Sequence, residues 1–271
     1  MTSAPRPLDG VKVVEFSHMV MGPTCGLILA DLGADVVKVE PASGGDNTRY
    51  LPGSGSGIFG TYNRNKRSVS VNLKSPEGLE FASRLVRESD VLIENFSAGV
   101  LERLGLGYEA MQKANPRLVY CALKGFLSGP YEQRVALDEV VQMMGGLAYM
   151  TGPEGRPLRA GASVNDVMGG LFGVVAIQAA LWERQRTGKG TFVRSGLFEN
   201  NMFLVAQHML QYRQTGVPAV PMPERKSAWA IYDVFETADD ENIFVGVVSD
   251  KQWTQFCNAF DLDDLLQNED L

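Results

Sequence analysis

The chain reads Val11-Lys-Val-Val-Glu-Phe16 near its start and Asp35-Val-Val-Lys-Val-Glu40 shortly afterwards. Both runs are short and rich in β-branched residues, which is typical of buried strands. Between them, Gly22 and Pro23 precede a predicted helix over residues 24–32, and Gly33 ends it. A strand, a helix and a second strand in this order predict a βαβ unit with parallel strands.

The same alternation continues through the first half of the chain. We expect strands over residues 68–73, 90–95 and 118–124, with helices over 77–89 and 108–114. The glycine- and serine-rich segment 42–60 is expected to be an irregular loop. The fold class is therefore α/β, with a Rossmann-like, mainly parallel sheet flanked by helices. In such sheets, ligands bind beyond the carboxyl ends of the strands.

Beyond Asp138 the pattern becomes helical and rich in glycine, and a further helix is expected over residues 194–214. We predict a large Rossmann-like, ligand-binding domain over residues 1–216, a proline-rich linker over 217–229 and the beginning of a small α+β domain over 230–271. That last segment contains two predicted strands and one predicted helix, and it is too short to bury a hydrophobic core alone. We therefore expect the small domain to be incomplete in this chain.

The composition argues against several classes of protein. The net charge is −7 and no run is rich in lysine or arginine, which argues against nucleic-acid partners. No uninterrupted apolar run reaches about 18 residues, so we expect a cytoplasmic protein without a membrane partner. Three cysteines and two histidines lack the spacing of metal ligands, so neither a metal site nor a disulfide framework is predicted.

A single carboxylate stands out in the stretch from Arg159 to Asp166, which is followed by an apolar run as far as Trp182. An aspartate at the start of a helix is commonly a cap, because the free N–H groups and the helix dipole favour it. Shielded from water, it can instead be a nucleophile that forms a covalent acyl intermediate. From the residues alone the capping interpretation of Asp166 is favoured, and the nucleophile interpretation stays open.

Basic side chains recur close to the predicted strand ends. They are Lys38, Arg67, Lys74, Arg103 and Lys124. Cations along the carboxyl edge of a parallel sheet would suit a ligand with several phosphates. His18, in the first strand-to-helix turn, could also contact a ligand. The glycine patterns of dinucleotide and P-loop sites are absent, so neither kind of site is predicted.

An ordered set of motifs resembles the class III CoA-transferases, also called the CaiB/BaiF family. It begins with Leu8-Asp-Gly-Val-Lys-Val-Val-Glu-Phe-Ser17, Met21-Gly-Pro23 and Ala30-Asp-Leu-Gly-Ala-Asp-Val-Val-Lys-Val-Glu-Pro41. It continues with Asn63-Arg-Asn-Lys-Arg-Ser68, Leu73-Lys-Ser-Pro-Glu-Gly78, Asp90-Val-Leu-Ile-Glu-Asn-Phe96 and Asn115-Pro-Arg-Leu-Val-Tyr120. The segment Gly161–Asp166 and the turn Arg184–Gly190 complete the set. The resemblance covers nearly the whole chain. The ordered set of motifs is specific for this family, although no single motif is specific by itself.

The resemblance implies an enzyme that moves coenzyme A from an acyl-CoA, with succinyl-CoA as a candidate donor, to a free carboxylic acid. Asp166 matches the family's nucleophile, and the CoA thioester is a substrate rather than a permanently bound cofactor. The family's CoA contacts match His18, Met19, Lys38, Val71, Asn72, Leu73, Lys74, Asn95, Phe96, Ser97, Arg103, Lys124, Gly125, Phe126 and Leu127 of this sequence.

Two departures from the family's patterns narrow the chemistry. Racemases of the family abstract a proton with a histidine, and Leu137 stands at that position here, which disfavours an acyl-CoA racemase. Val20 stands in the first turn, where formyl-CoA transferases carry glutamine, which disfavours formate and oxalate as the acids. A short dicarboxylate such as succinate or glutarate is the expected acid.

Members of this family are longer than this chain and form interlocked homodimers, so the resemblance also implies a homodimer. The missing return segment leaves a second interpretation open, in which the chain binds a CoA thioester without transferring it.

Overall fold

The computed structural model describes residues 4–225, 228–229 and 231–267. The chain divides into two units, Met1–Pro221 and Met222–Leu271, and each is described by itself. Residues 226, 227 and 230, which belong to the predicted linker and to the start of the predicted small domain, lie outside the described residues.

A six-stranded sheet with the order β3-β2-β1-β4-β5-β6 forms the centre of the first unit. Its strands are β1 (Lys12–Phe16), β2 (Asp35–Pro41), β3 (Arg67–Val71), β4 (Val91–Glu94), β5 (Val119–Lys124) and β6 (Phe192–Gly196). Every neighbouring pair is parallel, and Val13 of β1 lies opposite Val36 on one side and Val91 on the other. The predicted α/β class with a mainly parallel sheet is confirmed.

The edge strand β6 is missing from the sequence-based prediction. A helix was expected from Arg194, but the backbone first pairs with β5 up to Gly196 and only then enters α9 (Leu197–Thr215). A strand of five residues that runs directly into a helix leaves no turn signal between the two elements. The helical pattern of the following residues therefore hides the strand.

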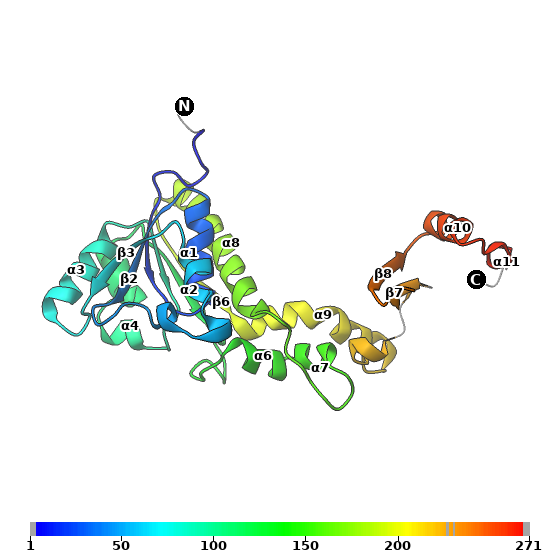
Figure 1. Ribbon diagram of the computed structural model, residues 1–271. Coiled ribbons are helices and arrows are strands. Elements are labelled where there is room, and N and C mark those ends of the chain that lie inside the picture. Colours follow the sequence, from blue (N-terminus) through cyan, green and yellow to red (C-terminus); the bar gives the residue numbers. More distant parts are fainter. Residues whose placement is uncertain (1–3, 226–227, 230, 268–271) are drawn as a thin grey trace. The chain divides into compact units, whose positions relative to one another are not determined.

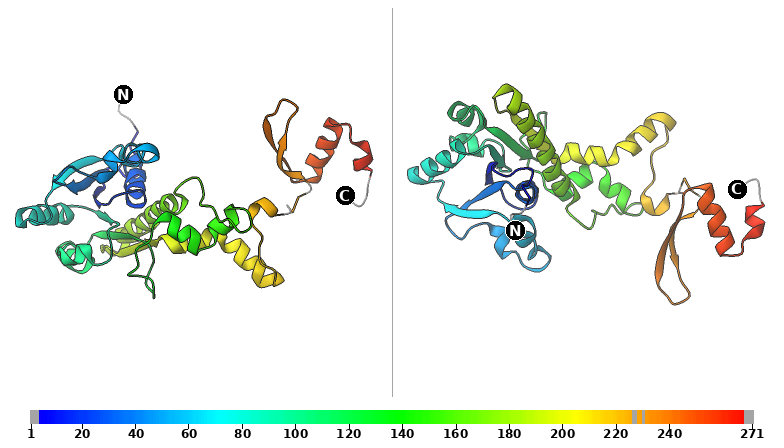
Figure 2. Two further views of the ribbon diagram at one scale, coloured as in Figure 1. Left: turned by 60° about the horizontal axis from the view of Figure 1, so that its bottom comes forward. Right: turned by 90° about the horizontal axis from the view of Figure 1, so that it is seen from above.

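Helices cover both faces of the sheet, as Figure 1 and Figure 2 show. Alternation along β1 sends Val13 toward the core beneath α1 (Met21–Asp31) and α8 (Val164–Thr187), and Val14 toward the core beneath α3 (Pro76–Arg87). Two apolar cores thus lie on opposite sides of strands that are buried on both faces, as parallel sheets require.

Shorter helices join these layers. They are α2 (Ile58–Asn63), α4 (Val100–Arg103), α5 (Tyr108–Ala114), α6 (Asp138–Met144) and α7 (Leu147–Thr151), with the 3-10 turns η1 (Asn47–Tyr50) and η2 (Gly53–Gly55). The expectation of an irregular loop over residues 42–60 was therefore wrong in part. Asp46 orders this segment by accepting a hydrogen bond from the backbone N–H of Thr48 (2.9 Å), which caps η1.

Glycines bring α8 into close contact with α1 and the sheet. A Cβ on Gly170 would lie 2.7 Å from the Cβ of Thr24 in α1, and one on Gly173 would lie 2.8 Å from the Leu123 side chain of β5. By length and composition, α8 is the one helix among the described residues that could cross a membrane. Core helices of soluble proteins meet the same criterion, and the glycine side of α8 is packed within the unit.

The second unit contains η3 (Met222–Glu224), an antiparallel hairpin of β7 (Ile231–Glu236) and β8 (Asn242–Val247), and the helices α10 (Asp250–Ala259) and α11 (Asp263–Leu266). Ser249 caps α10 by accepting a hydrogen bond from the backbone N–H of Gln252 (3.3 Å). The predicted strand, acidic turn, strand and helix are thus found in the expected order.

Replacing Gly170 by alanine should destabilise the protein by about 1–3 kcal/mol, because the added methyl group meets α1 and forces it away. Gly60 of α2 is the matched control, since a Cβ there has no neighbour within 4 Å. Gly60→Ala should leave the stability unchanged or raise it by up to about 1 kcal/mol. Urea unfolding followed by circular dichroism measures both, and equal midpoints for the two variants would contradict the close contact.

Candidate active site

A cavity of about 710 Å³ lies at the carboxyl ends of β1, β4 and β5. This is the edge at which parallel α/β sheets bind ligands, and the volume suits a small-molecule site. Its wall is formed by residues 18–21 after β1, 95–98 after β4, 123–125 of β5, 132–139, 161–163, and Ser54, Gly55, Ile58, Tyr62, Arg159, Asp166 and Leu197.

The turn after β1 forms one side of the cavity and is held by Asn95. The Asn95 side chain donates a hydrogen bond to the backbone oxygen of His18 (2.8 Å) and accepts one from its N–H (3.0 Å). Met19 has a φ of 61°, a left-handed conformation that side chains other than glycine rarely adopt. Burial lowers the pKa of His18 and so favours its neutral imidazole. A rigid turn with a neutral ring thus faces the cavity.

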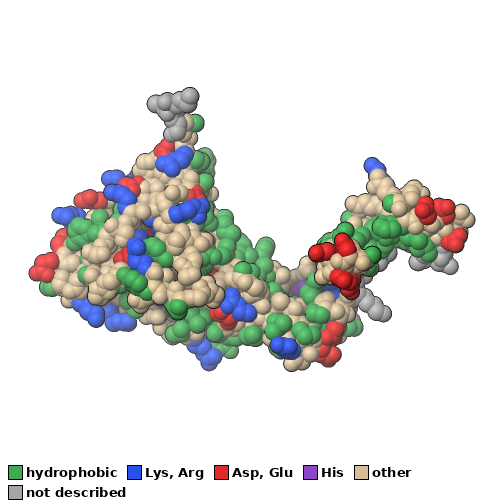
Figure 3. All heavy atoms as spheres, in the orientation of Figure 1, with side chains coloured by type: hydrophobic (Ala, Val, Ile, Leu, Met, Phe, Trp, Pro, Cys, Tyr) green, Lys and Arg blue, Asp and Glu red, His purple; other side chains and the backbone are tan. Residues whose placement is uncertain are grey.

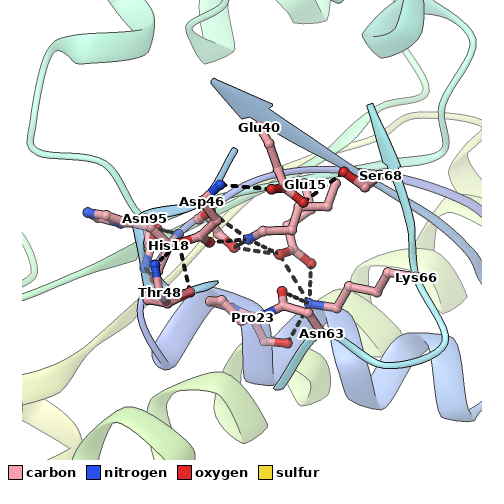
Figure 4. Close-up of polar contacts among 12 residues, drawn as sticks. Glu15, His18, Pro23, Glu40, Asp46, Thr48, Asn63, Lys66, Ser68 and Asn95 are labelled. Atoms are coloured by element: carbon pink, nitrogen blue, oxygen red, sulfur yellow. Dashed lines mark hydrogen bonds and ion pairs between the residues drawn. The ribbon is translucent and has the colours of Figure 1, made fainter. Parts of the chain in front are cut away.

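Four buried charged groups pack against this turn, and Figure 4 shows three of them, Glu15, Asp46 and Lys66. The Lys38 ammonium contacts the carboxylates of Glu15 (3.3 Å) and Asp46 (3.1 Å), and the Lys66 ammonium contacts Glu15 at 2.8 Å. All four side chains are at most 3% exposed. Two ammonium groups balance two carboxylates, which is the condition for burying charges at tolerable cost.

The same two lysines hold the backbone on either side of the turn. Lys38 donates a hydrogen bond to the backbone oxygen of Ser17 (2.7 Å), and Lys66 donates one to that of Pro23 (2.8 Å). Lys38 is among the residues predicted to contact CoA, and the structure places it behind the turn rather than on the cavity wall. Its ammonium is buried, paired and absent from the cavity wall, because the partners Glu15 and Asp46 come from distant segments that local sequence does not reveal.

Asp166 lies in the first turn of α8, half-buried on the cavity wall. It does not cap its own helix: within the described residues, the backbone N–H groups of Asn165 (2.7 Å) and Asp166 (3.2 Å) donate to the carboxylate of Asp138 in α6. Burial, followed by the negative charges of Asp138 and Glu139, raises the pKa of Asp166 to about 7, and Arg159 opposes them. The side chain is therefore a basic carboxylate, shielded from bulk water.

The remaining predicted contacts fall into two groups. His18, Met19, Asn95, Phe96, Ser97, Lys124 and Gly125 line the cavity together with Asp166. Val71, Asn72, Leu73, Lys74, Arg103, Phe126 and Leu127 do not. Val71 and Phe126 are core residues, whereas Lys74 and Arg103 are exposed beyond the strand ends. The guanidinium of Arg103 lies close to Gly99, next to the cavity residue Ala98.

Three of the five basic residues predicted near the strand ends, Lys38, Arg67 and Lys124, are paired with carboxylates. The Lys124 ammonium contacts the Glu94 carboxylate (2.6 Å) and donates to the backbone oxygen of Phe96 (2.7 Å). Arg67 begins β3, at the opposite edge of the sheet, and pairs with Asp35. The cavity wall instead carries Arg134, over the ring of Tyr131 at 4.4 Å, and Arg159, which pairs with Glu139.

Sequence reasoning also missed the roles of Asp138 and Gln142, because no local pattern indicates that a side chain of α6 caps a helix that begins 26 residues later. Among the described residues, no group of three or more His, Cys, Asp or Glu side chains could hold a metal ion.

Comparison with known proteins defines the class. A match to CoA-transferase family III extends over residues 8–271. The chain belongs to that family. It is 37% identical over 284 residues to the succinate–glutarate CoA-transferase of Agrobacterium fabrum, covering 99% of this chain and 71% of that one. It is 43% identical over 197 residues to the formyl-CoA:oxalate CoA-transferase of Rhodopseudomonas palustris strain TIE-1, covering 71% of this chain and 46% of that one.

A solved structure agrees. The CaiB/BaiF family protein from Brucella suis is 36% identical, with a TM-score of 0.86, over 98% of this chain and 72% of that one. The chain spans 59–62% of the length of three further curated relatives.

Replacing Lys38 by methionine should destabilise the protein by about 3–5 kcal/mol, because Glu15 and Asp46 then lose a buried counter-charge. Arg67→Met is the matched control, since it removes an exposed cation paired with Asp35 and should cost at most about 1 kcal/mol. Urea unfolding at pH 7 compares the two variants. A Lys38 variant as stable as the Arg67 variant would show that the buried pairs do not hold the turn.

Proposed function

We propose that this protein transfers coenzyme A from an acyl-CoA to a free carboxylic acid through a covalent intermediate on Asp166. The observation that carries the proposal is the position of the Asp166 carboxylate on the cavity wall. This carboxylate does not cap α8, and burial raises its pKa. Membership of CoA-transferase family III supplies the reaction class.

The reaction proceeds by exchange at carbonyl carbons and requires no net proton transfer. A carboxylate oxygen of Asp166 attacks the thioester carbonyl, the C–S bond breaks, and a mixed anhydride and the CoA thiolate form. The thiolate attacks the aspartyl carbonyl, which gives an aspartyl-CoA thioester and releases the donor acid. The acceptor carboxylate then attacks this thioester, and the thiolate returns to the acceptor's acyl carbon, which regenerates the Asp166 carboxylate. Burial protects these intermediates from hydrolysis.

For CoA we propose an approach past the turn after β1 and the segment 95–97, which line the cavity. The exposed cations Lys74 and Arg103 lie outside the cavity, where they can pair with the phosphate groups of a ligand whose thioester end reaches Asp166. We assign no phosphate contact to Lys38, because its ammonium is buried.

For the acceptor we propose a short dicarboxylate. Arg134 lies on the cavity wall and forms no ion pair with a described acidic residue, so its guanidinium can bind the second carboxylate of such an acid. The names of two relatives, a succinate–glutarate and a formyl-CoA:oxalate transferase, both include dicarboxylic acids. Succinyl-CoA is the proposed donor.

We further propose that the chain acts as a homodimer. Large apolar side chains are exposed along the outer sides of α8 and α9: Leu171, Val175, Trp182, Phe203, Met209 and Leu210. Figure 3 shows apolar side chains gathered over α8. A contiguous apolar surface of this kind is typical of an interface.

The second candidate function is binding of a CoA thioester without transfer. The cavity at the carboxyl ends of β1, β4 and β5 would serve this function equally, since binding alone needs no acylation of Asp166. An acyl-CoA racemase is disfavoured, because Leu137 lines the cavity where a proton-transferring group would be needed.

Incubation with succinyl-CoA should give a covalent adduct on Asp166, because the aspartyl thioester or anhydride accumulates when no acceptor is present. Intact-mass spectrometry detects the adduct, and hydroxylamine converts it to a hydroxamate that peptide mapping locates. Asp166→Asn, which keeps the shape of the side chain, should form none. CoA binding without an adduct would support the second candidate, and an adduct at another residue would refute the nucleophile.

The acceptor is tested with glutarate, succinate and oxalate against butyrate of similar size. Arg134→Gln should lower kcat/KM for the preferred dicarboxylate about tenfold, or about 1.4 kcal/mol of transition-state binding, and leave butyrate unchanged. Arg186→Gln on the exposed end of α8 is the control for loss of a positive charge. Equal loss for both classes of acid would refute the role of Arg134, and a preference for oxalate would reverse our interpretation of Val20.

A further inference from the structure

Two fully buried polar side chains of α6 hold the segment that carries Asp166. Asp138 and Gln142 are 2% and 0% exposed and stand one helical turn apart. One carboxylate oxygen of Asp138 accepts hydrogen bonds from the backbone N–H groups of Asn165 (2.7 Å) and Asp166 (3.2 Å). The other accepts a hydrogen bond from the side-chain amide of Gln142. The side-chain oxygen of Gln142 accepts a further one from the N–H of Ala160 (2.7 Å).

These contacts fix both ends of the segment 160–166. The first free amides of a helix are usually satisfied by a side chain at its N-cap. Ser163 occupies the N-cap of α8 and forms no such bond within the described structure. The cap is supplied by Asp138 from another helix, which joins α6 to α8 at the residue proposed as the nucleophile.

We infer that Asp138, oriented by Gln142, is a positioning residue for the reaction: it occupies the amides at the start of α8 and so leaves the Asp166 carboxylate free in the cavity. This inference rests on the proposed function. In this role Asp138 acts on the reaction through the backbone of Asp166 and through its charge.

The charge of Asp138 has a second effect on the same carboxylate. Asp138 and Glu139 of α6 and Arg159 of the preceding segment are the charged groups that face Asp166. After burial, Asp138 makes the largest contribution that raises the pKa of Asp166 to about 7. An aspartate that used the helix amides itself would have a lowered pKa and would be a weaker nucleophile. Because only the ionised form attacks, kcat/KM for the acyl-CoA should rise with pH through about 7.

The test separates charge from hydrogen bonding with three proteins. In Asp138→Asn, the new amide nitrogen faces the amide nitrogen of Gln142, so one hydrogen bond is lost whichever way Gln142 turns. In the double variant Asp138→Asn/Gln142→Glu, the new carboxylate accepts from the asparagine and from Ala160. Every hydrogen bond is then retained, while the negative charge moves one helical turn away from Asp166.

Three measurements are made on each protein: the urea midpoint, the pH profile of adduct formation at Asp166, and the pH titration of the Asp166 carboxyl carbon by ¹³C NMR, assigned with Asp166→Asn. In Asp138→Asn we expect a lower urea midpoint, titration about one pH unit lower and adduct formation about tenfold slower above pH 8. The double variant should recover the urea midpoint and keep the acid shift. CoA affinity should be unchanged in both.

A purely structural cap would lower the urea midpoint and leave the titration and the pH profile of Asp166 unchanged, which would overturn the inference. Identical titration curves in the native protein and the double variant would overturn the role of the charge. The NMR titration needs no substrate. If the native protein forms no adduct, the proposed function fails, and the titration still decides whether Asp138 sets the state of the Asp166 carboxylate.

Discussion

The close contact of α8 with α1 is the constraint on which the site depends. α8 is the longest helix among the described residues, and Gly169, Gly170 and Gly173 let its axis approach α1 and β5 where side chains would hold it away. This packing directs the start of α8 to the edge of the sheet where β1, β4 and β5 end. Without it, Asp166 would not share a cavity with the turn after β1, and a carboxylate in the first turn of a helix would have no particular function.

Most of the cations near the cavity are neutralised by carboxylates of the protein. Cations lie near the cavity, but Lys38, Lys66 and Lys124 are each paired with carboxylates of the protein itself. These pairs hold the cavity walls in place. They attract an anionic ligand only weakly, because the opposite charges of a pair largely cancel in the electrostatic potential of the cavity. In the proposed function, recognition of an anionic substrate therefore falls to Arg134 and to the exposed cations Lys74 and Arg103. Asp166 keeps an elevated pKa chiefly because it is buried, and the charges of Asp138 and Glu139 add to this effect against Arg159.

Local patterns were sufficient to predict much of this fold. The β-branched runs of β1 to β5, Pro76 at the start of α3 and the glycine after α1 are short-range signals, and they gave the parallel sheet in outline. Prediction failed where the cause is a contact between distant segments. The strand β6 exists because β5 offers it an edge, Lys38 is buried because Asp46 and Glu15 reach it, and Asp138 caps a helix that begins far along the chain. Asp166 was found as a candidate, but its free carboxylate follows only from the structure.

The buried quartet of Glu15, Lys38, Asp46 and Lys66 also restricts which substitutions this sequence can tolerate during evolution. An exposed pair such as Arg67 and Asp35 can lose either member with little penalty, so its positions can vary independently. Each member of the quartet, by contrast, leaves a charge stranded in the interior if it is replaced alone. Substitutions at these four positions are therefore expected to be coupled, although the positions are far apart in the sequence and local context does not reveal the coupling.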